Sequence, residues 1–441
     1  MTGHHRGRRV RAGLAAATAG VILTSCGIGE GFEGEPELSD GDVTISFNWW
    51  GADARTQMTL EAIELFEEEY PNIDVEPQYA DWTGYWDRLA TMTAAGEMPD
   101  VSQFDQLYLA AYAERGALLD LGRVSEFLDT SALGDELLDS GRVRGDLYAV
   151  PTGGTANGIL INTSLFAEYG VELPDVETWT WDDLTRVAVE LTEASDGEVH
   201  GISPFGSDSF SLTVWARQHG GQLFNDEGEL VLDPEILASY WEQELAFIDS
   251  GASPSVAQLS ETQGLPLDQG DLVTGKTAMG FIPAGQFNAY QAAAPDFDLR
   301  LADWPTNPDT EEGYQYLKPS MYWATSSTTQ HPAESALLID FLVNDPRVGE
   351  IFGLDRGEPG NPEFREIIEP TLDESSRRAL AFTNQITQEV GPTPPITPAG
   401  ASDIETLLTR YNQRVQFGDA SPREAAEDLI NELNDSIRAA S

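Results

Sequence analysis

Strand and helix patterns alternate along residues 43–116. Apolar side chains occupy every second position from Val43 to Trp49, which predicts a strand, and those from Leu60 to Tyr70 recur at helical spacing. The same order repeats, with expected strands over 73–79 and 100–104 and expected helices over 84–95 and 106–115. Strands joined by helices pair in parallel, so the pattern predicts an α/β fold with ligands at the carboxyl ends of its strands.

The chain is too long for one hydrophobic core. It has 441 residues, whereas single cores rarely grow beyond about 250 to 300 residues. A second set of strands and helices begins in residues 147–166, and a capping box at 180–183 predicts a helix through Glu193. Ser421, Pro422 and Glu424 mark the start of the last helix in the same way. We therefore expect two α/β domains.

The N-terminal segment is typical of exported proteins. Residues 1–25 hold four arginines, no acid, and an apolar stretch from Ala12 to Leu23 that is shorter than the ~20 residues of a membrane-spanning helix. The following Cys26 is the only cysteine, and residues 23–26 resemble the bacterial lipobox. We expect a lipoprotein signal peptide over 1–25 and lipidation of Cys26 rather than a buried thiol. Arg8-Arg9 leaves the Sec and twin-arginine export routes open.

The charge of the chain restricts its partners. The formal net charge is −51, and removal of the signal peptide makes it more negative. Nucleic acid and anionic membrane surfaces repel such a protein, so membrane attachment must come from lipid alone. Residues 26–41 are rich in glycine and acids and predict an anchor with a flexible tether. We expect the protein on the extracellular face of the cell membrane.

Catalytic motifs are missing from the sequence. Beyond the signal peptide the histidines are His200, His219 and His331, and none has metal-ligand spacing. Residues 153–158 lack the Gly-Lys-Ser/Thr ending of a phosphate loop, and no Gly-x-Ser-x-Gly elbow occurs. We expect no metal, no cofactor and no enzyme activity. A secreted glycoside hydrolase stays the alternative, because such enzymes also need aromatic rings and two carboxylates.

A series of motifs occurs in a characteristic order along the chain. They are FNWWG (47–51), DWTGYWDRLATMTAAGEMPDVSQFD (81–105), LYAVPTGGTANGILIN (147–162), TWTWDDL (178–184), VTGKTAMGF (273–281) and AESALLIDFLVNDP (333–346). This order resembles family 1 extracellular solute-binding proteins, the sugar-binding lipoproteins of ATP-driven (ABC) importers. The resemblance implies a monomer with a two-lobed periplasmic-binding-protein type II fold. Such a protein is expected to deliver a sugar, an oligosaccharide in kind, to transporter permease subunits.

By similarity to maltose-binding protein, the chain should cross between the lobes three times. The crossings are expected near 149–153, 303–322 and 355–360. The first lobe would comprise residues 42–150 and 305–355, and the second residues 151–304 and 356–441. Each lobe would contain a mainly parallel sheet. The tryptophan of maltose-binding protein is replaced here by Ile282-Pro283-Ala284-Gly285, so maltose is not the expected ligand.

Residues suited to sugar binding follow the predicted strands. A pyranose stacks one apolar face on an aromatic ring, and its hydroxyls bond to carboxylates, amides and arginines. Trp82, just outside a strand, is the best candidate platform, whereas Trp49 suits the core equally well and Asp105 could be a helix N-cap instead. The predicted site comprises Trp49, Trp50, Arg55, Asp81, Trp82, Asp105 and Gln106 of the first lobe, Thr152, Asn157 and Trp215 of the second, and Trp304, Trp323 and Arg356 of the later crossings.

Overall fold

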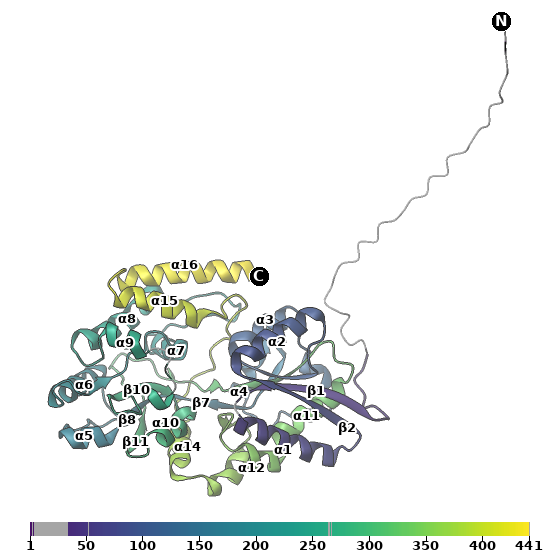
Figure 1. Ribbon diagram of the computed structural model, residues 1–441, viewed down its shortest axis with the longest axis horizontal. Coiled ribbons are helices and arrows are strands. Elements are labelled where there is room, and N and C mark those ends of the chain that lie inside the picture. Colours follow the sequence, from purple (N-terminus) through teal and green to yellow (C-terminus); the bar gives the residue numbers. More distant parts are fainter. Residues whose placement is uncertain (2, 4–33, 52, 263–264, 266, 441) are drawn as a thin grey trace.

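Two lobes lie side by side in the computed structural model (Figure 1). It describes residues 34–440, except residues 52, 263, 264 and 266, together with residues 1 and 3. The predicted signal peptide and Cys26 lie outside the described residues. Along the described part of the chain, no helix combines the length and the apolarity needed to cross a membrane.

The first lobe is built on a five-stranded sheet with the order β2-β1-β3-β13-β6. Its strands are β1 (Val43–Trp50), β2 (Ile73–Ala80), β3 (Val101–Phe104), β6 (Ala149–Pro151) and β13 (Tyr322–Thr325). Its other elements are α1 (Asp53–Glu69), α2 (Trp82–Ala95), α3 (Gln106–Glu114), the 3-10 helix η1 (Leu121–Val124), α4 (Asp135–Asp139), the hairpin of β4 (Arg142–Val143) and β5 (Asp146–Leu147), α11 (Pro332–Asn344), α12 (Pro346–Phe352), α13 (Pro362–Ile368) and η4 (Glu369–Thr371).

Both faces of the first sheet are covered, which explains its apolar strands. Phe47 packs with Phe66 of α1 and with α11 on one face, whereas Trp50 packs with Trp86 of α2 and with Phe104 on the other side. The predicted strands and the helices predicted over 84–95 and 106–115 are thus present within one or two residues, whereas α1 begins at Asp53, well before the pattern predicted from Leu60. A sheet buried on both faces holds the carboxyl ends of β1, β2 and β3 in fixed positions.

The second lobe contains a four-stranded sheet with the order β11-β8-β10-β9. Its strands are β8 (Asn157–Asn162), β9 (His200–Ile202), β10 (Thr277–Pro283) and β11 (Leu299–Ala302). Its helices are α5 (Thr163–Tyr169), α6 (Trp181–Ala194), α7 (Ser209–Gln218), α8 (Pro234–Asp249), α9 (Val256–Thr262), η2 (Leu267–Gln269), η3 (Ala284–Gln286), α10 (Phe287–Ala293), α14 (Glu374–Ile386), α15 (Ile404–Gln416) and α16 (Pro422–Ala440).

The sheets are less parallel than expected. β1 pairs in parallel with β2 and β3, but β13 is antiparallel to both of its neighbours. In the second sheet β8 is antiparallel to β10 and β11, and β9 and β10 form a parallel pair. The two-lobed α/β fold is confirmed, whereas the mainly parallel sheets expected in both lobes are corrected to mixed ones. The antiparallel strand β13 of the first sheet follows a return of the chain from the second lobe, whereas β8, β10 and β11 pair within the second lobe.

A third small sheet connects the lobes, with the order β12-β7-β14. Its strands are β7 (Gly153–Thr155), β12 (Lys318–Pro319) and β14 (Glu358–Pro359), one from each chain crossing. Tyr316 still packs in the core of the second lobe, and Phe364 of α13 packs in that of the first. Residues up to Tyr316 therefore still belong to the second lobe, and residues up to Phe364 still belong to the first. The chain passes between the lobes later than the positions predicted near 305 and 356.

The start of the described chain is attached to the first lobe. The backbone N–H of Ser39 donates to Oε1 of Glu334 over 2.7 Å. Glu334 lies in the first turn of α11 and is 1% exposed. Nη2 of Arg123 also donates to the carbonyl of Gly34 over 3.3 Å. The part of the predicted tether from residue 34 onward therefore contacts the folded body.

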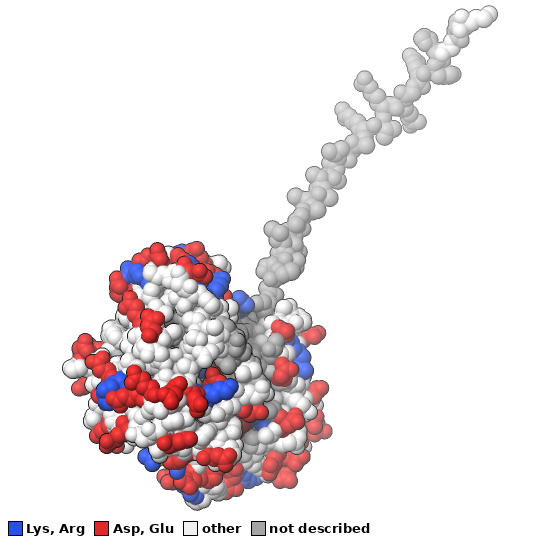
Figure 2. All heavy atoms as spheres, turned by 60° about the vertical axis from the view of Figure 1, so that its left-hand side comes forward, with Lys and Arg blue, Asp and Glu red and all other residues white. Residues whose placement is uncertain are grey.

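Local helix signals in the second lobe match the sequence. Thr180 and Asp183 form the predicted capping box of α6, and Ser421 and Glu424 exchange the corresponding hydrogen bonds before α16. On the face that Figure 2 shows, acidic side chains are widely spread with fewer basic ones among them. This distribution agrees with a solvated acidic surface rather than a single binding patch.

Candidate ligand-binding site

Trp82 is an exposed aromatic ring at the carboxyl ends of the first-lobe strands, where Tyr79 of β2 is exposed as well. Trp82 follows β2 as the first residue of α2 and is 41% exposed. Its ring lies edge-on to Trp50 at 5.0 Å and to Trp86 at 5.6 Å between centroids. Buried aromatic rings thus hold Trp82 in place while part of its surface stays open to solvent. That is the arrangement a stacking platform needs.

The two predicted aspartates are both helix N-caps. Oδ1 of Asp81 accepts from the N–H of Gly84 over 2.9 Å, and Oδ1 of Asp105 accepts from the N–H of Leu107 over 2.9 Å. The capping alternative for Asp105 is therefore present in the structure. Each carboxylate keeps a second oxygen, and both side chains are at least partly exposed.

The first turn of α3 joins the aromatic cluster to a pocket between the lobes. Tyr108 lies 6.3 Å from Trp82 and 4.0 Å from Trp86 between ring centroids. Gln106 and Leu107, on the same turn, line a narrow cavity of about 40 Å³. Its second-lobe wall includes Ser209, Phe210, Thr213, Tyr316, Lys318, Pro394 and Pro395. Gln106 therefore lies where a ligand could contact both lobes.

A larger pocket of about 380 Å³ adjoins this cavity in the second lobe. It is lined by the loop between β9 and α7 and by α15, with Asp208, Glu244, Glu405, Asn412 and Gln416 among its polar residues. Asp208 caps α7 through the N–H of Ser211 at 2.7 Å. Carboxylates and amides around a hollow of this size match the hydroxyl rim of a sugar.

Glu244 organises the loop that forms this pocket. The carboxylate is 1% exposed and accepts from the N–H groups of Phe205, at 2.8 Å, and Gly206. It also accepts from the amides of Asn412 and Gln416, each at 2.8 Å. Four donors compensate the burial of this charge. The loop between β9 and α7 and helix α15 are thus fixed to each other through one side chain.

Glu405 lies at the border of the two pockets. It accepts hydrogen bonds from the backbone N–H of Ser209, at 3.2 Å, and from its hydroxyl. Burial, followed by the nearby charge of Asp208, raises the pKa of Glu405 to about 7, and Lys318 opposes the shift. A lysine and two carboxylates thus meet beside Ser209.

Replacement of Glu405 by Gln should alter the pH dependence of stability. Because the folded pKa is about 7 and the ordinary value is 4.5, the folded protein keeps a proton that the unfolded chain loses between these values. The free energy of unfolding contributed by Glu405 therefore falls as the pH rises from 4.5 to 7. Urea denaturation at pH 4.5 and 7.5 should show a smaller loss for Glu405→Gln than for the parent. An equal loss in both proteins would contradict the assignment.

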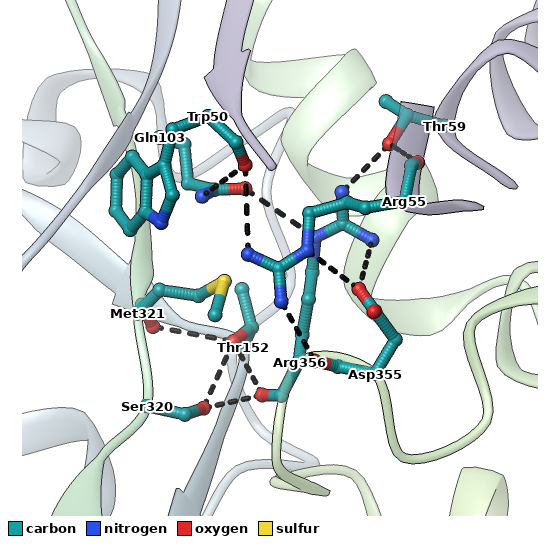
Figure 3. Close-up of polar contacts among 9 residues, drawn as sticks. All are labelled: Trp50, Arg55, Thr59, Gln103, Thr152, Ser320, Met321, Asp355 and Arg356. Atoms are coloured by element: carbon teal, nitrogen blue, oxygen red, sulfur yellow. Dashed lines mark hydrogen bonds and ion pairs between the residues drawn. The ribbon is translucent and has the colours of Figure 1, made fainter. Parts of the chain in front are cut away.

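Arg55 and Arg356 form a polar network at the hinge (Figure 3). Nε of Arg55 donates to Asp355 at 2.7 Å, and its Nη1 reaches the carbonyl of Trp50 at 3.5 Å. Oγ1 of Thr152 donates to the carbonyl of Arg356 at 3.2 Å. These three predicted site residues are brought together, but their polar groups are used to join chain segments to one another.

Four predicted tryptophans pack in the cores instead of the site. Trp49 and Trp323 are fully buried, and Trp215 and Trp304 are 4% and 2% exposed. Their ring faces are covered by neighbouring side chains, so none presents a stacking surface. Asn157 is also buried, with its amide bonded to Ser211 and to Trp304. These five predictions are corrected by the burial of their side chains.

Several residues of the two pockets were not predicted from the sequence. They are Ser209, Phe210, Tyr316, Lys318, Glu244 and Glu405. Lys318 carried a usable signal, because it is one of two lysines in a chain with 75 acidic residues. The others lie far apart in the sequence and meet only through the folding of the second lobe. In the part of the chain that the structure describes, no group of three or more His, Cys, Asp or Glu could hold a metal ion.

Comparison with known proteins agrees with this geometry. The sequence profile of bacterial extracellular solute-binding proteins matches residues 49–346. The chain belongs to this family. Extracellular solute-binding protein family 1 from Alicyclobacillus acidocaldarius is a similar solved structure, with 26% identity, a TM-score of 0.71, and coverage of 91% of this chain and 100% of the other.

Two further proteins similar to this solute-binding protein are named for the sugars that they bind. The diacetylchitobiose binding protein DasA of Streptomyces coelicolor is 23% identical over 97% of this chain and 98% of the relative. The oligogalacturonide binding protein of Yersinia enterocolitica, solved with digalacturonic acid, is 23% identical with a TM-score of 0.76, covering 90% of this chain and 100% of the other. The latter likeness shows the shared fold.

Proposed function

We propose that this solute-binding protein captures an oligosaccharide between its lobes and delivers it unchanged to the permease of an ABC transporter. The observation that carries the proposal is Trp82, an exposed indole fixed by buried rings. It lies 6.3 Å from the ring of Tyr108, whose neighbour Leu107 lines the pocket between the lobes. A sugar ring could stack on Trp82 while its hydroxyls bond to carboxylates and amides of the second lobe. The relatives that bind diacetylchitobiose and digalacturonic acid support this ligand class.

Capture rather than hydrolysis is the proposed activity. The carboxylates around the second-lobe pocket cap helices or join chain segments, as Asp208 and Glu244 do. A glycoside hydrolase needs two carboxyl groups free to face one glycosidic bond. The alternative of a secreted glycoside hydrolase is tested by the same experiment as the proposed function.

Attachment to the outer face of the cell membrane through lipid on Cys26 is part of the proposal. It rests on the sequence of residues 23–26 and on a net charge of −51, which disfavours direct contact with an anionic bilayer. The protein would act as a monomer that meets its permease at the membrane. In cells, Cys26→Ser should release the protein from the membrane fraction if the anchor is correct.

The ligand class can be tested by thermal unfolding with a panel of saccharides. Diacetylchitobiose, digalacturonic acid and a neutral glucose trisaccharide span N-acetylated, acidic and neutral sugars. A ligand at 100 times its Kd adds about 2.7 kcal/mol to the free energy of unfolding. We expect at least one saccharide to raise the unfolding temperature and to bind with 1:1 stoichiometry by calorimetry.

The bound saccharide should be recovered intact after hours of incubation. New reducing ends that disappear on replacing one carboxylate would favour the hydrolase instead. A panel in which no saccharide shifts the unfolding temperature, while amino acids or peptides do, would overturn the sugar proposal and leave the family unchanged.

A further inference from the structure

The three chain crossings between the lobes converge on one backbone carbonyl, that of Arg356 (Figure 3). Oγ1 of Thr152, on the first crossing, donates to this oxygen over 3.2 Å. The hydroxyl of Ser320, on the second crossing, donates to the same oxygen. Arg356 itself belongs to the third crossing, which leads into β14. One oxygen atom therefore joins all three.

The side chain of Arg356 is buried in the first lobe. It is 3% exposed, and Nη2 donates to Oγ1 of Thr59 on α1 over 2.7 Å. The guanidinium lies over the rings of Phe352, at 4.2 Å, and Trp323, at 5.2 Å. Burial lowers the pKa of Arg356 to about 9, so it remains charged at neutral pH. Nη1 also lies 3.5 Å from the carboxylate of Asp355, and Nε donates to Oε1 of Gln103 over 3.4 Å. Moving this buried charge away from these partners would have a large cost.

Backbone hydrogen bonds add to the connection between the crossings. The N–H of Thr152 donates to Met321 at 2.9 Å, and the N–H of Gly360 donates to Thr152 at 3.3 Å. A Cβ atom at Gly153 would lie 2.1 Å from the carbonyl oxygen of Glu358. The strands therefore approach too closely for any side chain at this position, and they are expected to move together.

We infer that Arg356 is a positioning residue that fixes the three crossings to the first lobe. The hydroxyls of Thr152 and Ser320 join the crossings into one unit, so that the second lobe rotates about a single axis. Without these hydroxyls the unliganded lobes would sample more orientations. A ligand that binds both lobes would have to restrict that added freedom, so affinity would fall. The inference about mobility is independent of the proposed function, whereas the effect on affinity rests on it.

The test compares a Thr152→Val, Ser320→Ala double variant with a matched control. In Thr163→Val, a second-lobe threonine loses a hydroxyl that donates to the carbonyl of Asp298 over 2.8 Å, away from the crossings. Spin labels at Glu64→Cys on α1 and Glu193→Cys on α6, in a Cys26→Ser background, report the distance between the lobes. Hydrogen exchange of the Thr152 and Gly360 amides reports the connection itself.

We expect the double variant to widen the distribution of distances between the labels at least twofold and to speed exchange at these amides at least tenfold. Thr163→Val should match the parent in both. Arg356→Met should also widen the distribution, and Arg356→Lys should restore part of the order. With diacetylchitobiose as ligand, the double variant should bind three- to tenfold more weakly.

Unchanged label distances and exchange in the double variant would overturn the inference even if Arg356→Met fails to fold. If diacetylchitobiose and the other saccharides do not bind the parent protein, the proposed function fails instead, and the label distances still decide the role of Arg356.

Discussion

Trp82→Ala should weaken oligosaccharide binding at least tenfold. The indole is held by Trp50 and Trp86 but keeps 41% of its surface exposed. Loss of its apolar contact with a sugar face should cost roughly 1.5 to 3 kcal/mol of binding free energy. Calorimetric titration with the saccharide that most stabilises the parent protein measures the change. Trp82→Phe should keep part of the affinity, because a smaller ring remains.

The matched control is Phe417→Ala. Phe417 is 59% exposed and follows α15 in the second lobe, and it lines neither pocket, although its neighbour Gln416 lines the second-lobe pocket. This variant should bind like the parent, which separates loss of a stacking surface from a general effect of removing an exposed ring. Full affinity in Trp82→Ala would show that the sugar stacks elsewhere, and the family assignment would be unaffected.

Glu244→Leu should destabilise the second lobe by about 3 to 5 kcal/mol. The substitution leaves the donors of Phe205, Gly206, Asn412 and Gln416 without their shared acceptor in a buried site. Urea denaturation followed by tryptophan fluorescence measures the loss. Because these donors fix the wall of the second-lobe pocket, ligand affinity should fall with the stability.

Two further variants on α8 show whether the loss comes from the buried carboxylate of Glu244 or from any change of a glutamate on this helix. Glu242→Leu changes an exposed residue of α8 and should alter stability by less than about 0.5 kcal/mol. Glu244→Gln keeps one acceptor oxygen and should fall between the parent and Glu244→Leu. Equal stability of Glu242→Leu and Glu244→Leu would contradict the role assigned to the four hydrogen bonds.

Local patterns were sufficient to predict the first half of the first lobe. The strands β1 to β3 alternate with helices whose first turns carry recognisable caps, such as Asp81 and Asp105. Both signals depend on neighbours in the sequence, so no tertiary information is needed. The position of Trp82 just beyond a strand followed from the same pattern, and its exposure agrees with the prediction.

The tryptophans show where the sequence becomes ambiguous. Trp49 and Trp50 are adjacent and point to opposite faces of β1, and both faces are covered by helices. Alternation therefore gives no sign of which ring reaches solvent, and neither is more than 8% exposed. Trp304 and Trp323 lie at crossings, where the sequence predicts proximity to the hinge but not the side on which each ring packs.

The second-lobe wall depends on contacts between distant segments. Phe210, Tyr316 and Lys318 meet at the pocket because β12 returns beside β7 after the chain has completed most of the second lobe. The antiparallel strand β13 also follows this return, so the simple alternation of strand and helix predicted too parallel a sheet in the first lobe. The sequence alone does not distinguish these three pocket residues from the other aromatic and charged residues of the chain, because they meet only in the folded structure.

The contact between Ser39 and Glu334 limits where a lipid-free form of the protein can begin. A chain starting at residue 34 keeps the donor that Ser39 supplies to a carboxylate with 1% exposure. A chain cut at the first strand would remove that donor from Oε1, and Oε2 of Glu334 already has no hydrogen-bond partner among the described residues. The residues just before β1 thus form part of the folded first lobe. Removing them would leave the buried carboxyl group of Glu334 without the donor that Ser39 supplies.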